Sequence, residues 1–171
     1  MNIGDTAPPF DLPATDGTDK GPGATPTVVV FTCNHCPYAL AWHDRLLRVA
    51  RDYGQRAVQV LLVNPNDAEG YPRDSFDAMK ERVAADGGWP AAYLRDEAQE
   101  VARLFGAKTT PDVFVLDAEG VLRYRGAPDS DYEDPSQDAA WLREALDALL
   151  EGRSPDPAET EPVGCSVKWL P

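Results

Sequence analysis

Hydrophobic residues fall into short runs and helical stripes that alternate along the chain. The β-branched run at residues 27–31 and the apolar run at 57–63 are typical of strands buried on both faces of a sheet. Shorter runs at 92–94 and 113–116 predict two further strands. Residues 121–125 follow the last of these across a Gly-containing turn, which predicts a hairpin partner.

Four segments have the residue spacing of amphipathic helices. The clearest begins after Pro37, where apolar residues form one stripe as far as a stop signal at Gly54. The others span residues 74–85, 97–105 and 136–150. Strands and helices alternate for about two units, and a hairpin and a final helix follow. This order predicts an α/β fold with a mixed central sheet and helices on both faces.

The two ends of the chain are rich in residues that favour turns. Residues 1–26 hold many prolines and glycines, which predict turns and short extended pieces that pair as an N-terminal β extension. Residues 153–171 contain four prolines and no helical pattern. With 171 residues the chain fits one domain. We therefore expect a domain at 1–152 and an extended C-terminal tail at 153–171 that packs on it.

Charge and composition narrow the choice of function. The net charge is −13 and the pI is about 4.4, so electrostatics gives the protein no reason to bind nucleic acid or an anionic membrane. No signal peptide or membrane span is recognisable, so the expected location is the cytoplasm. Three cysteines are too few for a disulfide framework. In a reducing compartment, a C-x-x-C pair is catalytic or metal-binding.

Two of the three cysteines lie in FTCNHCPY (31–38), at the predicted junction of a strand and a helix. The N–H groups and dipole of a helix start would lower the pKa of Cys33, and Cys36 would lie one turn later. His35, a cation when protonated, would further favour the Cys33 thiolate. The motif therefore predicts a redox pair in which Cys33 is the nucleophile and Cys36 resolves the mixed disulfide. His35 would tune the pair, and Asn34 would lie beside the substrate.

A metal site is the alternative interpretation of the motif, with His35, His43 and Cys165 as the remaining candidate ligands. His43 lies seven residues beyond Cys36, about 10.5 Å along a helix, which is too far for one ion. Cys33 and His35 would face different sides of a helix. No second C-x-x-C or H-x3-H completes a closed site. We therefore predict no metal and no cofactor, and keep a copper- or zinc-binding protein as an alternative.

Two further features are candidates for the site. Pro111 begins a predicted strand, where proline is either a packing feature or part of a cis bond. A cis bond would present the backbone of Thr110 to an extended peptide, so both residues are candidate substrate contacts. For Cys165 two readings stay open. It is a third redox thiol on a flexible tail, or a small apolar residue packed beside Trp169.

Together these motifs resemble the thioredoxin-like superfamily and its peroxiredoxin-like branch, the redoxin or AhpC/TSA-type proteins that carry C-x-x-C. The resemblance rests on GDTAPPFDLP (4–13), FTCNHCPY (31–38), YLRDE (93–97), TPDVF (110–114) and GCSVKW (164–169). It implies a thioredoxin fold with an N-terminal β extension and an inserted segment near residues 66–95. It also implies thiol–disulfide chemistry at Cys33 and Cys36.

The chain departs from both family patterns. Thr27 stands where thioredoxins have a buried acid. Val29 and Cys33 stand where peroxiredoxins have the proline and threonine that precede the peroxidatic cysteine, which aligns with Cys36. The favoured function is therefore a thiol–disulfide oxidoreductase in redox homeostasis, which acts on protein or small-molecule disulfides and is recharged by a thiol reductant. The alternative is an antioxidant thiol peroxidase with Cys36 peroxidatic and Cys33 resolving.

Overall fold

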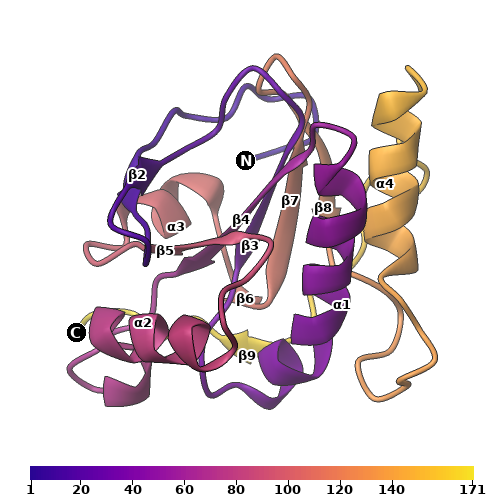
Figure 1. Cartoon of the computed structure of the whole chain (residues 1–171). Coiled ribbons are helices and arrows are strands. Elements are labelled where there is room, and N and C mark those ends of the chain that lie inside the picture. The colour runs from indigo at the N-terminus through magenta and orange to yellow at the C-terminus, as the bar shows by residue number, and fades with distance from the viewer.

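A five-stranded mixed sheet forms the centre of the molecule in the computed structural model, which describes residues 1–171 (Figure 1). The strand order is β5-β4-β3-β7-β8. These strands are β3 (Thr27–Phe31), β4 (Gln59–Asn64), β5 (Ala92–Arg95), β7 (Asp112–Leu116) and β8 (Leu122–Gly126). The first three run parallel, and β7 runs antiparallel to both β3 and β8. The predicted mixed sheet and its hairpin are confirmed.

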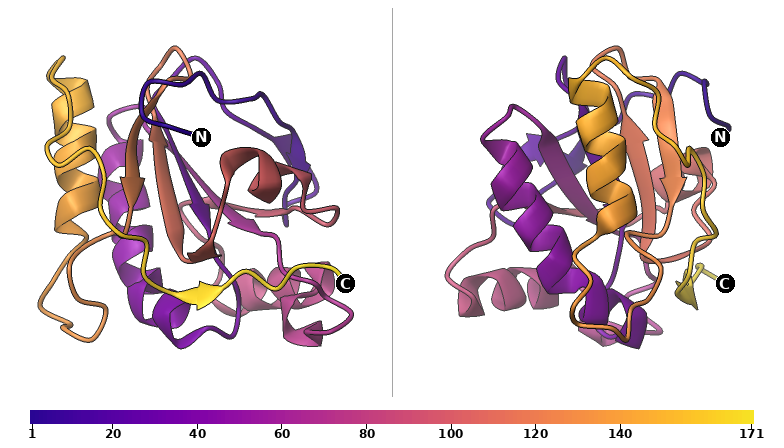
Figure 2. Two further views of the ribbon diagram at one scale, coloured as in Figure 1. Left: turned by 180° about the vertical axis from the view of Figure 1, so that it is seen from behind. Right: turned by 90° about the vertical axis from the view of Figure 1, so that its right-hand side faces the viewer.

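Helices cover both faces of this sheet (Figures 1 and 2). On one face lie α1 (Pro37–Gly54), α2 (Phe76–Ala85) and α4 (Ala140–Leu150), and on the other lies α3 (Glu100–Phe105). Successive residues of β3 point to opposite faces. Val28 and Val30 therefore join the core under α1 and α4, while Val29 and Phe31 join the core under α3. This explains why the whole β3 run is apolar.

Short elements complete the domain. The N-terminal extension holds the hairpin of β1 (Leu12–Pro13) and β2 (Asp19–Lys20). Between β4 and β5 the chain inserts the 3-10 helix η1 (Pro72–Asp74) and then α2, in the region that the family resemblance implies. None of the helices is long and apolar enough to span a membrane.

Several predicted boundaries are wrong by two to four residues, and positive φ angles explain most of the errors. The helices predicted from residues 97 and 136 begin at Glu100 and Ala140. Each follows a residue in the left-handed region, Gln99 (φ 63°) or Ala139 (φ 56°), which cannot belong to a right-handed helix. The pattern of hydrophobic residues does not predict these two positive φ angles.

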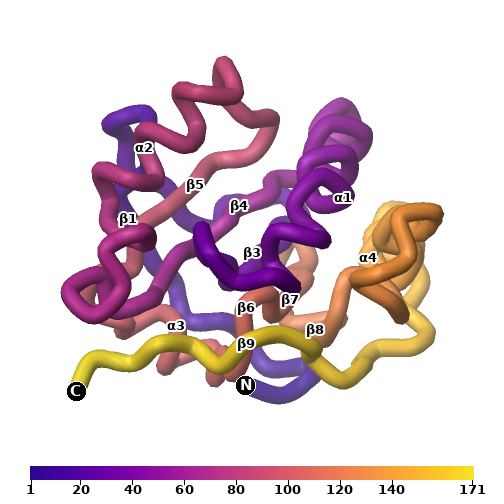
Figure 3. Tube along the Cα trace, turned by 90° about the horizontal axis from the view of Figure 1, so that it is seen from below, coloured from indigo at the N-terminus to yellow at the C-terminus, as the bar shows by residue number.

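The C-terminal tail runs back across the domain instead of extending away from it (Figures 2 and 3). Its strand β9 (Cys165–Ser166) pairs antiparallel with β6 (Thr109–Thr110), the two residues before Pro111. Val167 is buried in the core under α3. The tail therefore brings the third cysteine to the same end of the molecule as the C-x-x-C motif.

Candidate active site

The C-x-x-C motif forms the loop between β3 and α1. Cys36 is the N-cap residue of α1 and Pro37 is its first residue, so Cys33 lies in the loop ahead of the helix. The expectation that Cys33 occupies the helix start is therefore wrong, because the helix begins one turn later. Both cysteines are only 1% exposed, and neither forms a disulfide in this structure.

Thr110 contacts both sulfur atoms. The Cys33 Sγ lies 3.4 Å from the Thr110 hydroxyl and also accepts a hydrogen bond from the backbone N–H of Cys36 at 3.4 Å. The Cys36 Sγ lies 3.2 Å from the carbonyl oxygen of Thr110, to which its S–H donates when protonated. The Thr110–Pro111 bond is cis. The structure thus brings this dipeptide and the two cysteines together, and its contact with a substrate stays a prediction.

Donors around Cys36 favour its ionised form. Its pKa is lowered, first by the hydrogen bond from Cys33 and, against an opposing effect of burial, by the thiol of Cys165 and the N–H groups of Ala39 and Cys165. The pKa of Cys33 is raised, first by its hydrogen bond to Cys36, next by burial, and also by the negative charge of Asp74. The reduced pair therefore shares one negative charge, and the role of Cys33 as the nucleophile stays a prediction.

Cys165 is the third member of this sulfur cluster. Its Cα pairs with that of Thr110 in the β6–β9 ladder, and its side chain packs against the cluster of Cys33, Cys36 and Ala39. Burial and contact with Cys36 raise its pKa to about 11. Trp169 instead lies under the guanidinium of Arg103, 4.5 Å from its ring centre. Cys165 thus packs as a small apolar residue against the cysteine cluster, and its role as a third redox thiol stays a prediction.

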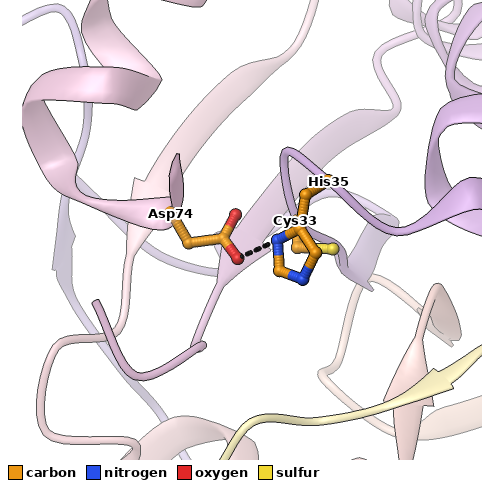
Figure 4. A group of neighbouring side chains, drawn as sticks. All are labelled: Cys33, His35 and Asp74. Atoms are coloured by element: carbon orange, nitrogen blue, oxygen red, sulfur yellow. Dashed lines mark ion pairs between the residues drawn. The ribbon is translucent and has the colours of Figure 1, made fainter. Parts of the chain in front are cut away.

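His35 and Asp74 lie beside Cys33 (Figure 4). The Nδ1 atom of His35 is 2.6 Å from Oδ2 of the fully buried Asp74, and the ring stacks on Tyr71. The contact to Asp74 is an ion-pair approach and not a well-directed hydrogen bond. One ligand atom each of Cys33, His35 and Asp74 lie within 4.8 Å of one another. A carboxylate and an imidazole therefore lie within 4.8 Å of the Cys33 sulfur.

The same trio has the donor types of a metal site. The prediction that Cys33 and His35 face different sides is wrong, because both lie in the loop and not on a helix. The trio supplies three ligands, whereas a closed zinc site needs four. His43 does not belong to it. That side chain is buried against the Trp89 ring at 4.5 Å, and burial lowers its pKa to about 4.

Asp74 is a site residue that sequence reasoning missed. Its carboxylate accepts hydrogen bonds from the backbone N–H of Asn34 at 2.7 Å and from the side chains of Asn64 and Asn66, each at 3.1 Å. Asn64 ends β4 and Asn66 lies two residues later, and the carboxyl end of β4 lies beside that of the parallel strand β3. These two amides could therefore have indicated the site from the sequence. Asp74 comes from the inserted segment, where no pattern places it. Thr27, at the position of the thioredoxin acid, is buried and bonds the Thr25 carbonyl instead.

Asn34 makes its side-chain hydrogen bonds inside the protein. Its amide donates to the Arg73 carbonyl at 2.8 Å, and its Oδ1 accepts from Tyr93 at 2.7 Å and Arg82 at 2.8 Å. These bonds hold the motif loop against α2 and β5, so Asn34 positions the loop. Its contact with a substrate stays a prediction.

Known proteins share both the sequence family and the fold. The AhpC/TSA family model matches residues 3–125, and among curated proteins none matches. The structure of an uncharacterized conserved protein from Geobacillus kaustophilus is similar with 38% identity and a TM-score of 0.93, covering 99% of this chain and 93% of that one. A hypothetical protein from Sinorhizobium meliloti 1021 shares 31% identity with a TM-score of 0.91, covering 99% and 96%.

A more distant structure supports the fold alone. The thioredoxin-family thiol:disulfide interchange protein from Chlorobium tepidum TLS is 18% identical with a TM-score of 0.66, covering 88% of this chain and 99% of that one. Family and fold together support an oxidoreductase activity that uses thiols. The matched segment spans more than half of the chain and includes the cysteine pair and the Thr110–Pro111 bond. The chain therefore belongs to the AhpC/TSA family and has a thioredoxin-like fold.

Proposed function

We propose that the protein is a thiol–disulfide oxidoreductase whose redox couple is Cys33 and Cys36. The observation that carries the proposal is the shared environment of the two sulfurs, which both contact Thr110 while the backbone of Cys36 donates to Cys33. One thiol of the pair favours the ionised form and the other keeps its proton. A pair in this state is ready for thiol–disulfide exchange, which needs one thiolate and one resolving thiol.

The exchange proceeds in two steps. The Cys36 thiolate attacks one sulfur of a substrate disulfide, which breaks that S–S bond, forms a mixed disulfide and releases the first substrate thiolate. Cys33 then gives up its proton and attacks the Cys36 sulfur, which forms the Cys33–Cys36 disulfide and releases the second substrate thiolate. The substrate gains two electrons and the couple loses two. We propose His35, which lies beside Asp74 and near Cys33, as the acceptor of the Cys33 proton.

The substrates proposed are protein or small-molecule disulfides, and a thiol reductant returns the couple to its dithiol form. The test is a redox titration against glutathione, with insulin reduction as the activity, on Cys165→Ser and on the same variant carrying Cys33→Ser or Cys36→Ser as well. Cys165→Ser should titrate as one two-electron couple, and each double variant should lose the couple and the turnover. Full insulin reduction by either double variant would refute the proposal.

A thiol peroxidase is the second candidate, favoured by the lowered pKa of Cys36. Its thiolate would attack a peroxide oxygen, giving a Cys36 sulfenate and water or an alcohol. Cys33 would then condense with the sulfenate, releasing water and forming the same disulfide. Stopped-flow peroxide consumption separates the candidates. A rate no faster than that of a free thiol, unchanged in Cys36→Ser, would remove the peroxidase.

A further inference from the structure

The C-terminal tail occupies the backbone edge that was expected to receive a substrate peptide. Ser166 pairs with Thr109 and Cys165 with Thr110, and the N–H of Val167 donates to the Lys108 carbonyl at 3.2 Å. Figure 3 shows the tail lying along β6 at this end of the molecule. The protein therefore supplies its own extended strand at this edge, and that strand carries a cysteine.

Side-chain and backbone contacts fix this strand in place. A Cβ on Gly164 would lie 2.3 Å from the carbonyl oxygen of Thr110, so the close approach of the two backbones requires glycine. Val167 is 3% exposed and packs in the core. The backbone N–H of Lys168 donates to Asn66, whose own amide donates to Asp74. The docked tail is thus joined to the hydrogen-bond network that supports the cysteine loop.

Docking places Cys165 against the buried cysteine pair. Its Cα pairs with that of Thr110, whose carbonyl oxygen lies 3.2 Å from the Cys36 sulfur, and its side chain packs against the cluster that holds Cys33 and Cys36. The two loop cysteines are almost completely buried, whereas Cys165 is partly exposed. A disulfide confined to the loop would be hard for a second protein to reach. A disulfide that includes Cys165 would lie on the surface strand.

We propose that Cys165 is a third redox thiol, which moves the disulfide from the buried Cys33–Cys36 pair to a Cys36–Cys165 pair that a dithiol reductant reaches. This inference rests on the proposed function. The Cys165 thiolate attacks the Cys36 sulfur, the Cys33–Cys36 bond breaks, and Cys33 leaves as a thiolate. Cys165 loses a proton and Cys33 gains one, so the step involves no net oxidation.

This transfer is the first half of a disulfide relay. The second half reduces the Cys36–Cys165 disulfide. A thiolate of the dithiol reductant attacks the Cys165 sulfur and the Cys36 thiolate leaves. The second thiol of the reductant then resolves the mixed disulfide and frees Cys165. The reductant becomes a disulfide, and all three cysteines of the protein are reduced. The relay therefore separates the buried oxidation step from the exposed reduction step.

Disulfide mapping of the full-length protein tests the relay. Wild type, Cys33→Ser, Cys165→Ser and Ser166→Ala are oxidised with one equivalent of glutathione disulfide, quenched with acid, alkylated and mapped by mass spectrometry. We expect both pairs in wild type and Ser166→Ala, only Cys36–Cys165 in Cys33→Ser, and only Cys33–Cys36 in Cys165→Ser. Reduction of the oxidised protein by dithiothreitol should slow about tenfold in Cys165→Ser and stay unchanged in Ser166→Ala.

Two outcomes distinguish failure of the relay from failure of the function. A Cys33–Cys36 disulfide that forms in wild type without any Cys36–Cys165, with equal reduction rates in wild type and Cys165→Ser, overturns the relay and leaves the proposed function intact. If Cys33 and Cys36 form no disulfide in wild type, both are overturned. Hydrogen exchange at Val167, compared in Cys165→Ser and wild type, controls for loss of the docked strand.

Discussion

At the residue scale, solution measurements can determine which cysteine sulfur is ionised. The ordinary pKa of a cysteine thiol is 9.0, and hydrogen bonds lower the pKa of Cys36 below it. Reduced wild type should therefore show ultraviolet thiolate absorbance at neutral pH. The absorbance should disappear as the pH falls through the pKa of Cys36. Cys36→Ser should lack this component at neutral pH. A component lost in Cys33→Ser and kept in Cys36→Ser would assign the charge to Cys33.

Asp74 offers a second test at this scale. In Asp74→Asn the charge is removed and an amide N–H₂ meets the side-chain amide of Asn66 or Asn64, which leaves a buried donor unsatisfied. We expect a loss of about 1–3 kcal/mol in the free energy of unfolding. Urea unfolding measures it, with Glu81→Gln on the exposed side of α2 as control, expected within about 0.5 kcal/mol of wild type. Equal stability of Asp74→Asn and the control would contradict a supporting role.

His43 predicts a pH dependence of stability. Burial, with the nearby charge of Arg82, lowers its pKa from 6.5 to about 4, so between these values the unfolded chain binds more protons than the folded one. Stability from this residue is therefore complete above 6.5 and is lost as the pH falls toward 4. Relative to His43→Gln, wild type should lose on the order of 3 kcal/mol across this window. Urea unfolding at both ends measures the difference, and a constant difference would refute the prediction.

At the scale of elements, the docking of β9 depends on Gly164. A Cβ there meets the Thr110 carbonyl, so Gly164→Ala should release the strand from β6. The Val167 amide, which donates to Lys108, should exchange its hydrogen at least about tenfold faster, while the amides of β3 keep wild-type rates. Ser166→Ala, on the same strand with an exposed side chain, is the control. Unchanged exchange at Val167 in Gly164→Ala would show that the close approach is not needed.

The same elements show how far the sequence predicts this molecule. The sheet and the long helix α1 were predictable because the strands are short continuous apolar runs and the helix repeats its apolar residues with a period of 3.6. The starts of α3 and α4 were not, because the left-handed residues Gln99 and Ala139 are not marked by glycine. The cysteine pair and Thr110–Pro111 were found from local motifs. Asp74 and the position of Cys165 depend on distant segments that meet only in the folded chain.

A buried acid–base pair outside the site shows the same limit. The acidic stretch at 129–134 reads as a solvated loop, yet Asp129 is buried and pairs with Arg45 of α1 at 3.0 Å. Asp129 also accepts hydrogen bonds from Trp42 and from the backbone of Ala139 at the start of α4. Composition alone suggests an exposed loop, but these contacts join two helices. Whether an acidic residue of such a stretch is solvated or buried therefore depends on the cation that the fold places beside it.

At the scale of the whole molecule, redox state and stability are linked. Groups that stabilise the Cys36 thiolate act only in the folded, reduced protein, so they favour that form over the folded disulfide. The same groups raise the reduction potential of the couple relative to that of the unfolded chain, because whatever stabilises the reduced fold raises the potential. The difference in unfolding free energy between the reduced protein and the disulfide form therefore measures how strongly the site stabilises the thiolate.

We expect the reduced protein to be more stable than the Cys33–Cys36 disulfide form, by about 1–3 kcal/mol at neutral pH, where 1.4 kcal/mol corresponds to about 30 mV. Because the pKa of Cys36 is lowered, its contribution is greatest near the unfolded thiol pKa of 9.0 and is lost as the pH falls through the folded pKa. The difference should therefore shrink on acidification. Urea unfolding of both forms measures it, in Cys165→Ser so that only one disulfide forms. A disulfide form that is the more stable one at every pH would contradict this prediction.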